Sequence, residues 1–287
     1  MKNYTLFLWI ALLMLGISGT IGAREVASFN DGWEFKKGPF SKEALQAVQK
    51  WNSDWQEVSI PHTWNADDMQ KQASAFYEGV GYYRKKFTFP ENMEGKRIFL
   101  RFEGVGSYAE VYINGYLAGT HKGAYSAFAC EISSQVKFGK ENEIIVKADN
   151  SSRPDVIPTN HILFGVYGGI YRPVWLGVTE TCSIIANDCA SPGVYITQKN
   201  VSKKSAEVTV KVKVDNATLA PVPLELENAI YDRNGKLVKK HSQNFELTPQ
   251  GVQNYSSHFR LNNPIYGKDV KTHICIKSFH VSCRMDA

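Results

Sequence analysis

The chain has 287 residues, of which 43% are hydrophobic and 12% aromatic, with 33 Lys and Arg against 28 Asp and Glu. This composition is typical of a folded protein and excludes a disordered or low-complexity chain. The formal charge of +5 is small and spread along the sequence, which argues against a nucleic-acid-binding protein. The length accommodates one large or two ordinary domains, whereas a (β/α)8 barrel alone takes about 250 residues.

Residues 1–23 have the organisation of a secretory signal peptide. Lys2 supplies the positive charge, residues 4–17 are almost wholly apolar, and small residues follow up to Ala23. The apolar run is shorter than the roughly 20 residues that span a bilayer, which argues against a membrane anchor. We therefore predict cleavage near Ala23 and an exported bacterial protein, periplasmic or extracellular, with no membrane contact after cleavage.

The five cysteines are too few for a disulfide framework in a chain of this size. Cys182 and Cys189 are close enough in sequence to pair, but buried thiols are an equally good interpretation. The sequence contains no CxxC motif and no His/Cys cluster with zinc spacing, so we predict neither a metal site nor a cofactor.

From about residue 24, apolar and polar residues alternate with the period of two that predicts half-buried strands. Asn114-Gly115 favours the φ > 0 conformations of a type I′ hairpin turn between two such strands. One short helix is predicted at 42–49, with Ser41 as its N-cap. No βαβ alternation occurs, which argues against a parallel sheet. The strands expected here cover 83–89, 98–102, 111–113, 116–120, 143–148 and 174–178.

The pattern becomes plainer after about residue 181, where short strands and turns recur at close spacing. This spacing is typical of a small sandwich of immunoglobulin type. We thus predict an all-β protein, with a large antiparallel sandwich over 24–180 and a smaller one from 181. The strands expected in the second part cover 208–214, 224–231, 236–241 and 255–261.

No catalytic motif of the GxSxG, HExxH, P-loop or GxGxxG type occurs in the sequence. Hydrolysis of a glycoside would need two carboxylates that face one bond. Single glutamates in predicted strands are more typical of a solvated strand face, and the candidates by residue type are Glu103, Glu110 and Glu131. His62 and His121 are interpreted as hydrogen-bonded structural residues.

Aromatic and amide side chains gather near the predicted loops of the first sandwich. They suit sugar recognition, because a sugar ring has C–H faces and hydroxyl edges. Composition alone favours the alternative interpretation, in which the aromatic residues belong to the core of a sandwich. The residues of this set are Trp64, Asn65, Tyr77, Tyr125, Asn160, His161, Tyr167 and Tyr171.

Several segments resemble one family when they are taken in order. They are NDGWEF at 30–35, VSIPHTW at 58–64, GYYRKKF at 81–87, the run from FEGV to GAY at 102–125, and GGIYRPV at 168–174. Together they are similar to the N-terminal sugar-binding domain of glycoside hydrolase family 2, the β-galactosidase, β-glucuronidase and β-mannosidase group. Residues 181–263 resemble the immunoglobulin-like domain of that family. The resemblance implies a galactose-binding-like jelly roll followed by an immunoglobulin-like sandwich.

The same resemblance implies that catalysis resides elsewhere. In the family a (β/α)8 barrel comes next and carries both catalytic glutamates, with the acid/base in an Asn-Glu-Pro motif. Asn142-Glu143 is the tempting match here, but Ile144 follows it, so no catalytic role is transferred. We assign no catalytic residue to this chain.

The resemblance also bears on substrate binding. Galactosidase-like members place a carboxylate, five residues before the first glycine of Gly-Gly-Ile-Tyr-Arg, in the active site. That position is Leu163 here, which argues against galactose specificity. The nearest polar residues, Asn160 and His161, are the candidate substrate-binding residues, and Arg172 is expected to form a structural ion pair.

The sequence changes character after Asn263. Where the family continues with Asp-Pro-Tyr-Leu-Tyr, residues 264–287 show no such segment. When residues 271–278 are translated back into permitted codons and the reading frame is moved one base earlier, the same bases encode Lys-Asp-Pro-Tyr-Leu-Tyr-Lys-Val. We therefore predict that 264–287 is an out-of-frame tail and that the immunoglobulin-like sandwich over 181–263 is incomplete, with an exposed sheet edge.

The sequence thus predicts the N-terminal fragment of an exported, β-galactosidase-like glycoside hydrolase of family 2. It would lack the catalytic barrel and be inactive alone. Its partner would be a carbohydrate, the terminal sugar of an oligosaccharide or glycan. The alternatives are a free-standing carbohydrate-binding protein and a structural or adhesive sandwich protein without a sugar site.

Overall fold

The computed structural model describes residues 25–38, 54–68, 76–157, 165–232, 235–262, 264 and 279–283. Within these residues the regular structure is all β, apart from one 3₁₀ turn, η3 (Glu91–Met93). The signal peptide expected at 1–23, the helix expected at 42–49, and Asn160 and His161 lie outside the described residues. None of the described residues belongs to a helix that is long and apolar enough to cross a membrane.

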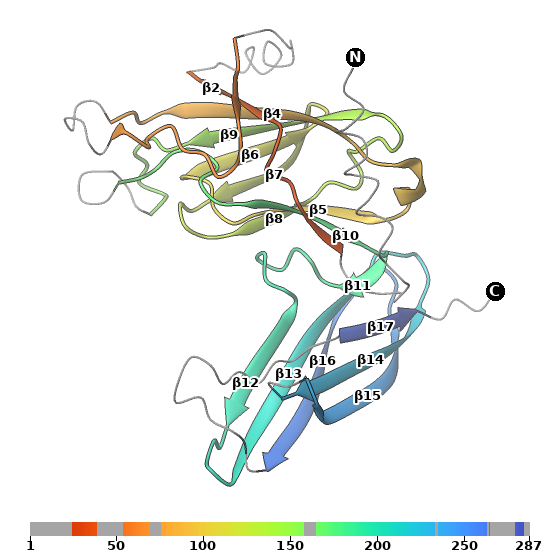
Figure 1. Cartoon of the computed structure of the whole chain (residues 1–287). Coiled ribbons are helices and arrows are strands. Elements are labelled where there is room, and N and C mark those ends of the chain that lie inside the picture. The colour runs from red at the N-terminus through yellow and green to blue at the C-terminus, as the bar shows by residue number, and fades with distance from the viewer. Residues whose placement is uncertain are drawn as a thin grey trace, which may run out of the picture.

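The strands form two lobes, of which the first is a jelly-roll sandwich of two antiparallel sheets (Figure 1). One sheet has the order β3-β2-β4-β9-β6-β7, and the other has the order β1-β10-β5-β8. The strands are β1 (Glu25–Ser28), β2 (Trp33–Lys37), β3 (Gln56–Val58), β4 (Val80–Thr88), β5 (Arg97–Phe102), β6 (Tyr108–Ile113), β7 (Tyr116–Lys122), β8 (Phe128–Glu131), β9 (Glu141–Asp149) and β10 (Val174–Thr179).

The core of this lobe lies between the two sheets. Alternate residues of each strand point inward, as the period-2 pattern predicts, and Trp33, Leu100, Phe102, Val111 and Ile144 are fully buried. Each large side chain buried in this way stabilises the fold by about 1.5–3 kcal/mol. The core therefore fixes the strand ends, and with them the loops that carry candidate functional residues.

The predicted hairpin is confirmed between β6 and β7. Asn114 and Gly115 have φ values of 51° and 84°, the left-handed conformation that favours Asn and Gly. The Asn114 Nδ2 atom donates to Asn142 Oδ1 at 2.8 Å, and its Oδ1 accepts from the Glu143 backbone N–H at 3.0 Å. Asn142 and Glu143 therefore belong to a strand–turn junction, which agrees with assigning them no catalytic role.

β4 corresponds to the half-buried strand expected at 83–89, but its outer face is less solvated than a half-buried strand implies. Arg84, which alternates with the inward-facing residues of this strand, has a buried side chain. Arg84 Nε donates to Glu34 Oε2 at 2.6 Å, and the guanidinium lies 4.1 Å from the centroid of the Trp55 ring. A small second cluster, with Tyr82 and Ile145 at its centre, covers the outer face of the sheet here, so both faces of β4 are shielded from water.

The second lobe is an immunoglobulin-like sandwich. In one sheet β11, β12 and β16 pair with β13, and in the other β15 and β17 flank β14. Val208, Val210, Val212 and Val214 alternate inward along β13, which confirms the predicted strand. The strands are β11 (Cys182–Ile184), β12 (Val194–Lys199), β13 (Ser205–Asn216), β14 (Val222–Tyr231), β15 (Leu237–Leu247), β16 (Gly251–Asn262) and β17 (Phe279–Cys283).

Cys182 and Cys189 are thiols rather than a disulfide. The interpretation as buried thiols is confirmed for Cys182 and is wrong for Cys189, which is exposed. In the first lobe Cys130 is also a buried thiol, and burial raises its pKa to about 11. A buried thiol with such a pKa stays protonated at neutral pH and behaves as a small apolar side chain.

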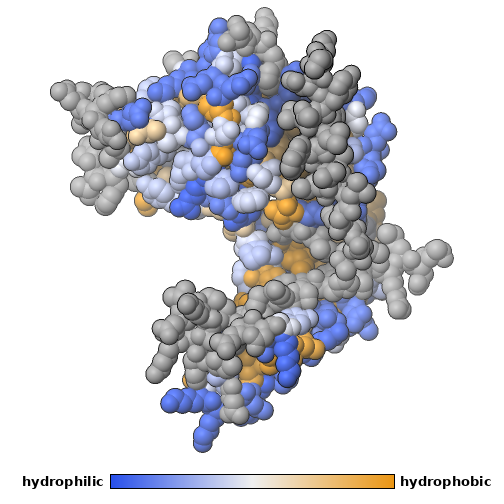
Figure 2. All heavy atoms as spheres, viewed as in Figure 1, coloured by the Kyte–Doolittle hydropathy of each residue, from blue (hydrophilic) through white to orange (hydrophobic). Residues whose placement is uncertain are grey.

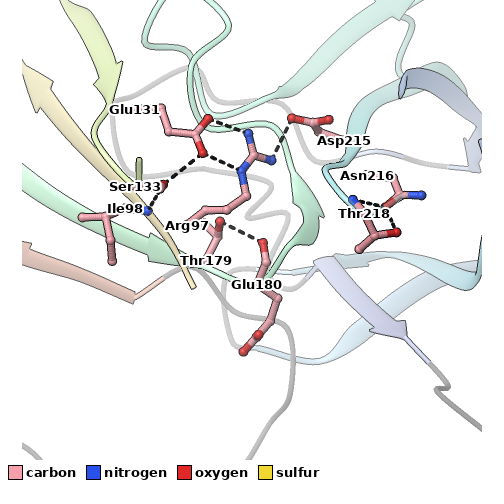
Figure 3. Close-up of polar contacts among 9 residues, drawn as sticks. All are labelled: Arg97, Ile98, Glu131, Ser133, Thr179, Glu180, Asp215, Asn216 and Thr218. Carbon is pink, nitrogen blue, oxygen red and sulfur yellow. Dashed lines mark hydrogen bonds and ion pairs between the residues drawn. The ribbon is translucent and has the colours of Figure 1, made fainter. Parts of the chain in front are cut away.

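Arg97 joins the two lobes. Its guanidinium forms a bidentate pair with Glu131 of its own lobe, at 2.9 and 2.8 Å, and Nη1 donates to Asp215 Oδ2 of β13 at 2.7 Å (Figure 3). Arg101 Nε also donates to the Ala190 carbonyl across the same boundary, at 3.1 Å. Apolar residues are visible at the waist between the lobes (Figure 2). The lobes are thus held by a partly buried ion-pair network and not by the linking chain alone.

Candidate functional site

Two buried asparagines connect the loops at one end of the jelly roll. Asn65 lies in the turn after β3, and Asn150 directly follows β9. Asn150 Nδ2 donates to Asn65 Oδ1 at 3.2 Å and to the Val166 carbonyl at 2.9 Å, and Asn150 Oδ1 accepts from the Gly79 N–H at 2.8 Å. The pair therefore cross-links segments that are far apart in the sequence.

Asn65 uses both ends of its amide in this network. Its Nδ2 donates to Asp68 Oδ2 at 2.7 Å and to the Tyr77 carbonyl at 2.9 Å, and its Oδ1 accepts from the Gly168 N–H at 2.8 Å. Since Asn65 and Asn150 are almost completely inaccessible to solvent, their amides are structural and are not available to a ligand. The network fixes the chain on the C-terminal side of residues 158–164, the segment that contains Asn160 and His161.

Trp64 and Tyr77 belong to the core, as the composition-based alternative predicts. Trp64 is buried and stacks on Phe35, with ring centroids 5.7 Å apart, and Tyr77 packs against the same core. A methyl group at Gly168 would overlap the Trp64 ring, so that position requires glycine for steric reasons. The Trp64 indole N–H has no hydrogen-bond partner among the described residues.

Tyr125, Tyr167 and Tyr171 differ from these core residues. Tyr125 and Tyr167 are 53% and 38% exposed, and Tyr171 is half-buried. The Tyr171 hydroxyl donates to the Ala124 carbonyl, which ties its ring to the loop that carries Tyr125. Of the aromatic residues that the sequence singled out and the structure describes, Tyr125 and Tyr167 are exposed, whereas Tyr171, like Tyr77, is half-buried.

Arg172 was expected to form a structural ion pair, and no such pair is present in the described part of the chain. Its guanidinium lies 5.9 Å from the centroid of the Tyr171 ring, and the residue is exposed. Glu103 is paired with the neighbouring segment of the chain, since its backbone N–H donates to the Pro173 carbonyl at 3.1 Å, but its carboxylate is engaged elsewhere. It accepts from Arg101 Nη1 and from Trp175 Nε1, both at 2.9 Å.

The other candidate glutamates are also structural. Glu131 binds Arg97, and Glu110 accepts from the Tyr112 hydroxyl at 2.6 Å and from Lys147 Nζ at 3.2 Å. Burial raises the pKa of the Glu110 carboxyl, but the contacts with Tyr112 and Lys147 outweigh that effect and hold the pKa below its ordinary value. None of Glu103, Glu110 and Glu131 is therefore available to act as a general acid.

Both histidines are hydrogen-bonded, as expected. His62 Nδ1 lies 2.7 Å from the Tyr83 hydroxyl, and burial together with the charge of Lys37 lowers the pKa of the ring. His121 Nε2 lies 3.1 Å from Ser126 Oγ, its ring stacks on Phe128, and burial lowers its pKa. Each histidine shapes a loop and stays neutral at physiological pH.

A cavity of about 530 Å³ lies beside β2 and β3, lined among others by Trp33, Glu34, Glu57 and Lys86. The described residues contain no group of three or more His, Cys, Asp or Glu side chains that could hold a metal ion. Sequence reasoning missed Asp68 and Asn150, although an amide directly after a strand is a recognisable signal for a loop anchor.

The site is thus an exposed group of tyrosines and one arginine on a rigid jelly roll, in which the three candidate glutamates are committed to structural contacts.

Residues 26–180 match the model for the sugar-binding domain of glycosyl hydrolases family 2, and residues 192–266 match a second model of that family. A beta-glucuronidase of Bacteroides fragilis is 36% identical over 246 residues, which cover 86% of this chain and 33% of that protein. The chain belongs to glycosyl hydrolase family 2. It spans about a third of the length of the curated beta-glucuronidase.

Two solved structures give the same result. A putative beta-galactosidase from Bacteroides fragilis is 65% identical with a TM-score of 0.80, and the match covers 84% of this chain and 36% of that one. A beta-glucuronidase from Bacteroides uniformis is 31% identical with a TM-score of 0.79, and the match covers 85% and 28%. The two-sandwich arrangement described above is therefore the arrangement of these relatives.

Proposed function

We propose that this chain provides the sugar-binding and immunoglobulin-like domains of a retaining β-glycosidase that removes terminal sugars from oligosaccharides or glycans. The observation that carries the proposal is the match of both domains, in order, to glycosyl hydrolase family 2. Retaining glycosidases use one carboxylate as nucleophile and another as acid/base. Because Glu103, Glu110 and Glu131 are committed to ion pairs and hydrogen bonds, both catalytic groups would come from the barrel that the family resemblance implies.

The proposal includes export. Lys2, the apolar run at 4–17 and the small residues up to Ala23 support secretion of the mature chain. Expression in a bacterial host, followed by fractionation and N-terminal sequencing of the exported protein, tests this part. A mature N-terminus near Arg24 in the periplasm or medium is expected, and retention of an uncleaved chain in the cytoplasm would contradict it.

A domain exchange tests the enzymatic role. In the 65% identical putative beta-galactosidase, the aligned N-terminal segment is replaced by residues 24–263 of this chain. If the two sandwiches serve the same enzyme function, the chimera hydrolyses the chromogenic glycoside that the parent hydrolyses, with kcat within about tenfold. A chimera that folds and assembles but has lost turnover would show that these domains serve another function.

The second candidate is a free-standing carbohydrate-binding protein, which the exposure of Tyr125 and Tyr167 favours. In that case the chain binds glycans tightly on its own, and the chimera is inactive. Glycan binding by the purified chain together with the exchange experiment separates the two functions.

A further inference from the structure

The second lobe has an open sheet edge at β12. β12 pairs with β13 along one side, and none of the described residues pairs with its other side (Figure 1). The Lys213 N–H donates to the Gly193 carbonyl at 2.9 Å, directly before β12 begins. Because hydrogen-bonded and non-hydrogen-bonded pairs alternate along an antiparallel ladder, the backbone N–H and C=O groups of Val194, Ile196 and Gln198 point away from β13, toward the open side.

Side-chain contacts hold this edge strand in place. The Tyr195 hydroxyl donates to Asp188 and lies 2.8 Å from Ser191 Oγ. Lys213 Nζ pairs with the same Asp188 carboxylate at 2.7 Å and lies 5.7 Å from the centroid of the Tyr195 ring. A strand that is already fixed in this way loses little conformational entropy when a second strand binds beside it.

The inward-facing side of β12 is only partly covered. Ile196 lies opposite Val210 in the register, so both side chains point to the same face of the sheet, toward the other sheet of the sandwich. Val210 is fully buried, whereas Ile196 is 49% exposed. The other sheet therefore does not reach over β12, and an apolar side chain on the core-facing side remains in contact with water.

β12 also lacks the features that protect other strand edges of this protein. β1, β3 and β8 have only three or four residues, and β7 and β15 pair with their neighbours through a register shift. β16, at the opposite edge of the same sheet, carries Arg260. β12 has six residues in unbroken register, is rich in residues with high β propensity, and has its one charge, Lys199, at its end. Such an edge is a template for pairing with another strand.

We propose that β12 pairs antiparallel with β12 of a second copy of this chain, about a two-fold axis at Ile196. In this register Ile196 lies opposite its counterpart and Val194 lies opposite Gln198, so the backbone groups on the open side exchange hydrogen bonds. The two Ile196 side chains cover each other on the core-facing side. Lys199 lies opposite Gly193, so no like charges meet. The strand is thus complementary to itself, as an interface between two identical copies requires.

Sedimentation velocity of the mature chain, from residue 24, over about 5 to 300 μM tests this proposal. A single pair of six-residue strands is smaller than a standard protein interface, so we expect reversible dimers with a Kd of about 10–100 μM. Ile196→Lys and Ile196→Glu each bring like charges together at the two-fold axis and should weaken dimerisation by at least about tenfold. An equimolar mixture of the two variants brings opposite charges together there and should restore the dimer.

Val252→Lys is the matched control, because Val252 is 50% exposed and lies on β16, at the opposite edge of the same sheet. It should dimerise as wild type does. Each variant alters a half-exposed side chain, so urea unfolding midpoints close to that of wild type are expected and confirm that each chain is folded.

A wild-type chain that stays monomeric up to about 300 μM would overturn the proposal. Dimers that persist in Ile196→Lys, or that are lost to the same extent in Val252→Lys, would overturn the assignment of the interface to β12. A mixture of the two folded Ile196 variants that stays monomeric would overturn the two-fold register. The domain exchange reports separately on the proposed enzymatic function.

Discussion

The contact between the lobes gives the sharpest energetic prediction. Arg97 is 9% exposed, and its partners Glu131 and Asp215 are 32% and 15% exposed. Burial lowers the pKa of the Arg97 guanidinium, but the hydrogen bonds and charges of Glu131 and Asp215 raise it overall, so the arginine stays charged. Its removal leaves two partly buried carboxylates without their cation.

The loss of unfolding free energy expected on removing Arg97 follows from these exposed fractions. Breaking a buried ion pair by removing one partner costs about 3–5 kcal/mol, and the partial exposure of Glu131 places Arg97→Met near the lower end. Asp215→Ala removes one charged hydrogen bond and should cost about 1.5–3 kcal/mol. In the Arg97→Met background the same substitution should cost nothing, because Asp215 has already lost its partner.

Urea unfolding of the two single variants and the double variant measures this coupling. We expect a coupling energy of about 1.5–3 kcal/mol, which equals the cost of Asp215→Ala in the wild type because that cost vanishes in the Arg97→Met background. Lys36→Met is the control: its pair with Asp54 is 3.8 Å long and Asp54 is exposed, so the loss should stay within about 0.5 kcal/mol. Additive effects of Arg97→Met and Asp215→Ala, within about 0.3 kcal/mol, would refute the assignment of the contact between the lobes.

Three further predictions concern the first lobe. Asn150→Ala should lower the free energy of unfolding by about 2–4 kcal/mol, because it leaves the buried partners of the Asn150 amide without hydrogen bonds. Urea unfolding measures this loss, and the control Asn254→Ala, at an exposed position, should change the free energy by less than about 0.5 kcal/mol. Gly168→Ala should lower the thermal midpoint by several degrees, because the added methyl group overlaps Trp64, and an unchanged midpoint would contradict that packing. Burial raises the pKa of the Glu131 carboxyl, but the hydrogen bonds from Arg97 outweigh this effect, so the pKa in the folded state lies below the ordinary 4.5. The carboxylate's contribution to the free energy of unfolding is therefore lost as the pH falls through the folded-state pKa. Glu131→Gln should flatten the acid side of the curve of unfolding free energy against pH, and an unchanged slope would count against this account.

The fold was predictable because its signals are local. Alternation along β13 and the Asn114-Gly115 turn depend on neighbouring residues alone, and both are present as predicted. The burial of Arg84 could not be predicted from the pattern of its own strand, because it depends on Trp55 and Glu34, which lie on other strands or loops. A period of two reports which face a residue is on, but not whether something distant covers that face.

The site was only partly predictable for a similar reason. The sequence selected a set of aromatic residues, but residue type does not separate Trp64 and Tyr77, which pack in the core, from Tyr125, which is exposed. Arg172 was expected in a structural ion pair, which the described residues do not contain. The competing partner Glu103 is bound instead to Arg101 and Trp175, and that choice depends on three-dimensional geometry.

We propose that this chain recognises sugar for a family 2 glycosidase and does not itself cleave it. The most direct measurement is turnover of chromogenic β-glucuronides and β-galactosides by the purified chain, beside the domain-exchange chimera. We predict no turnover by the chain above the uncatalysed rate, and turnover by the chimera. Turnover by the purified chain that Glu103→Gln, Glu110→Gln or Glu131→Gln abolishes would contradict the claim, because these carboxylates would then be catalytic.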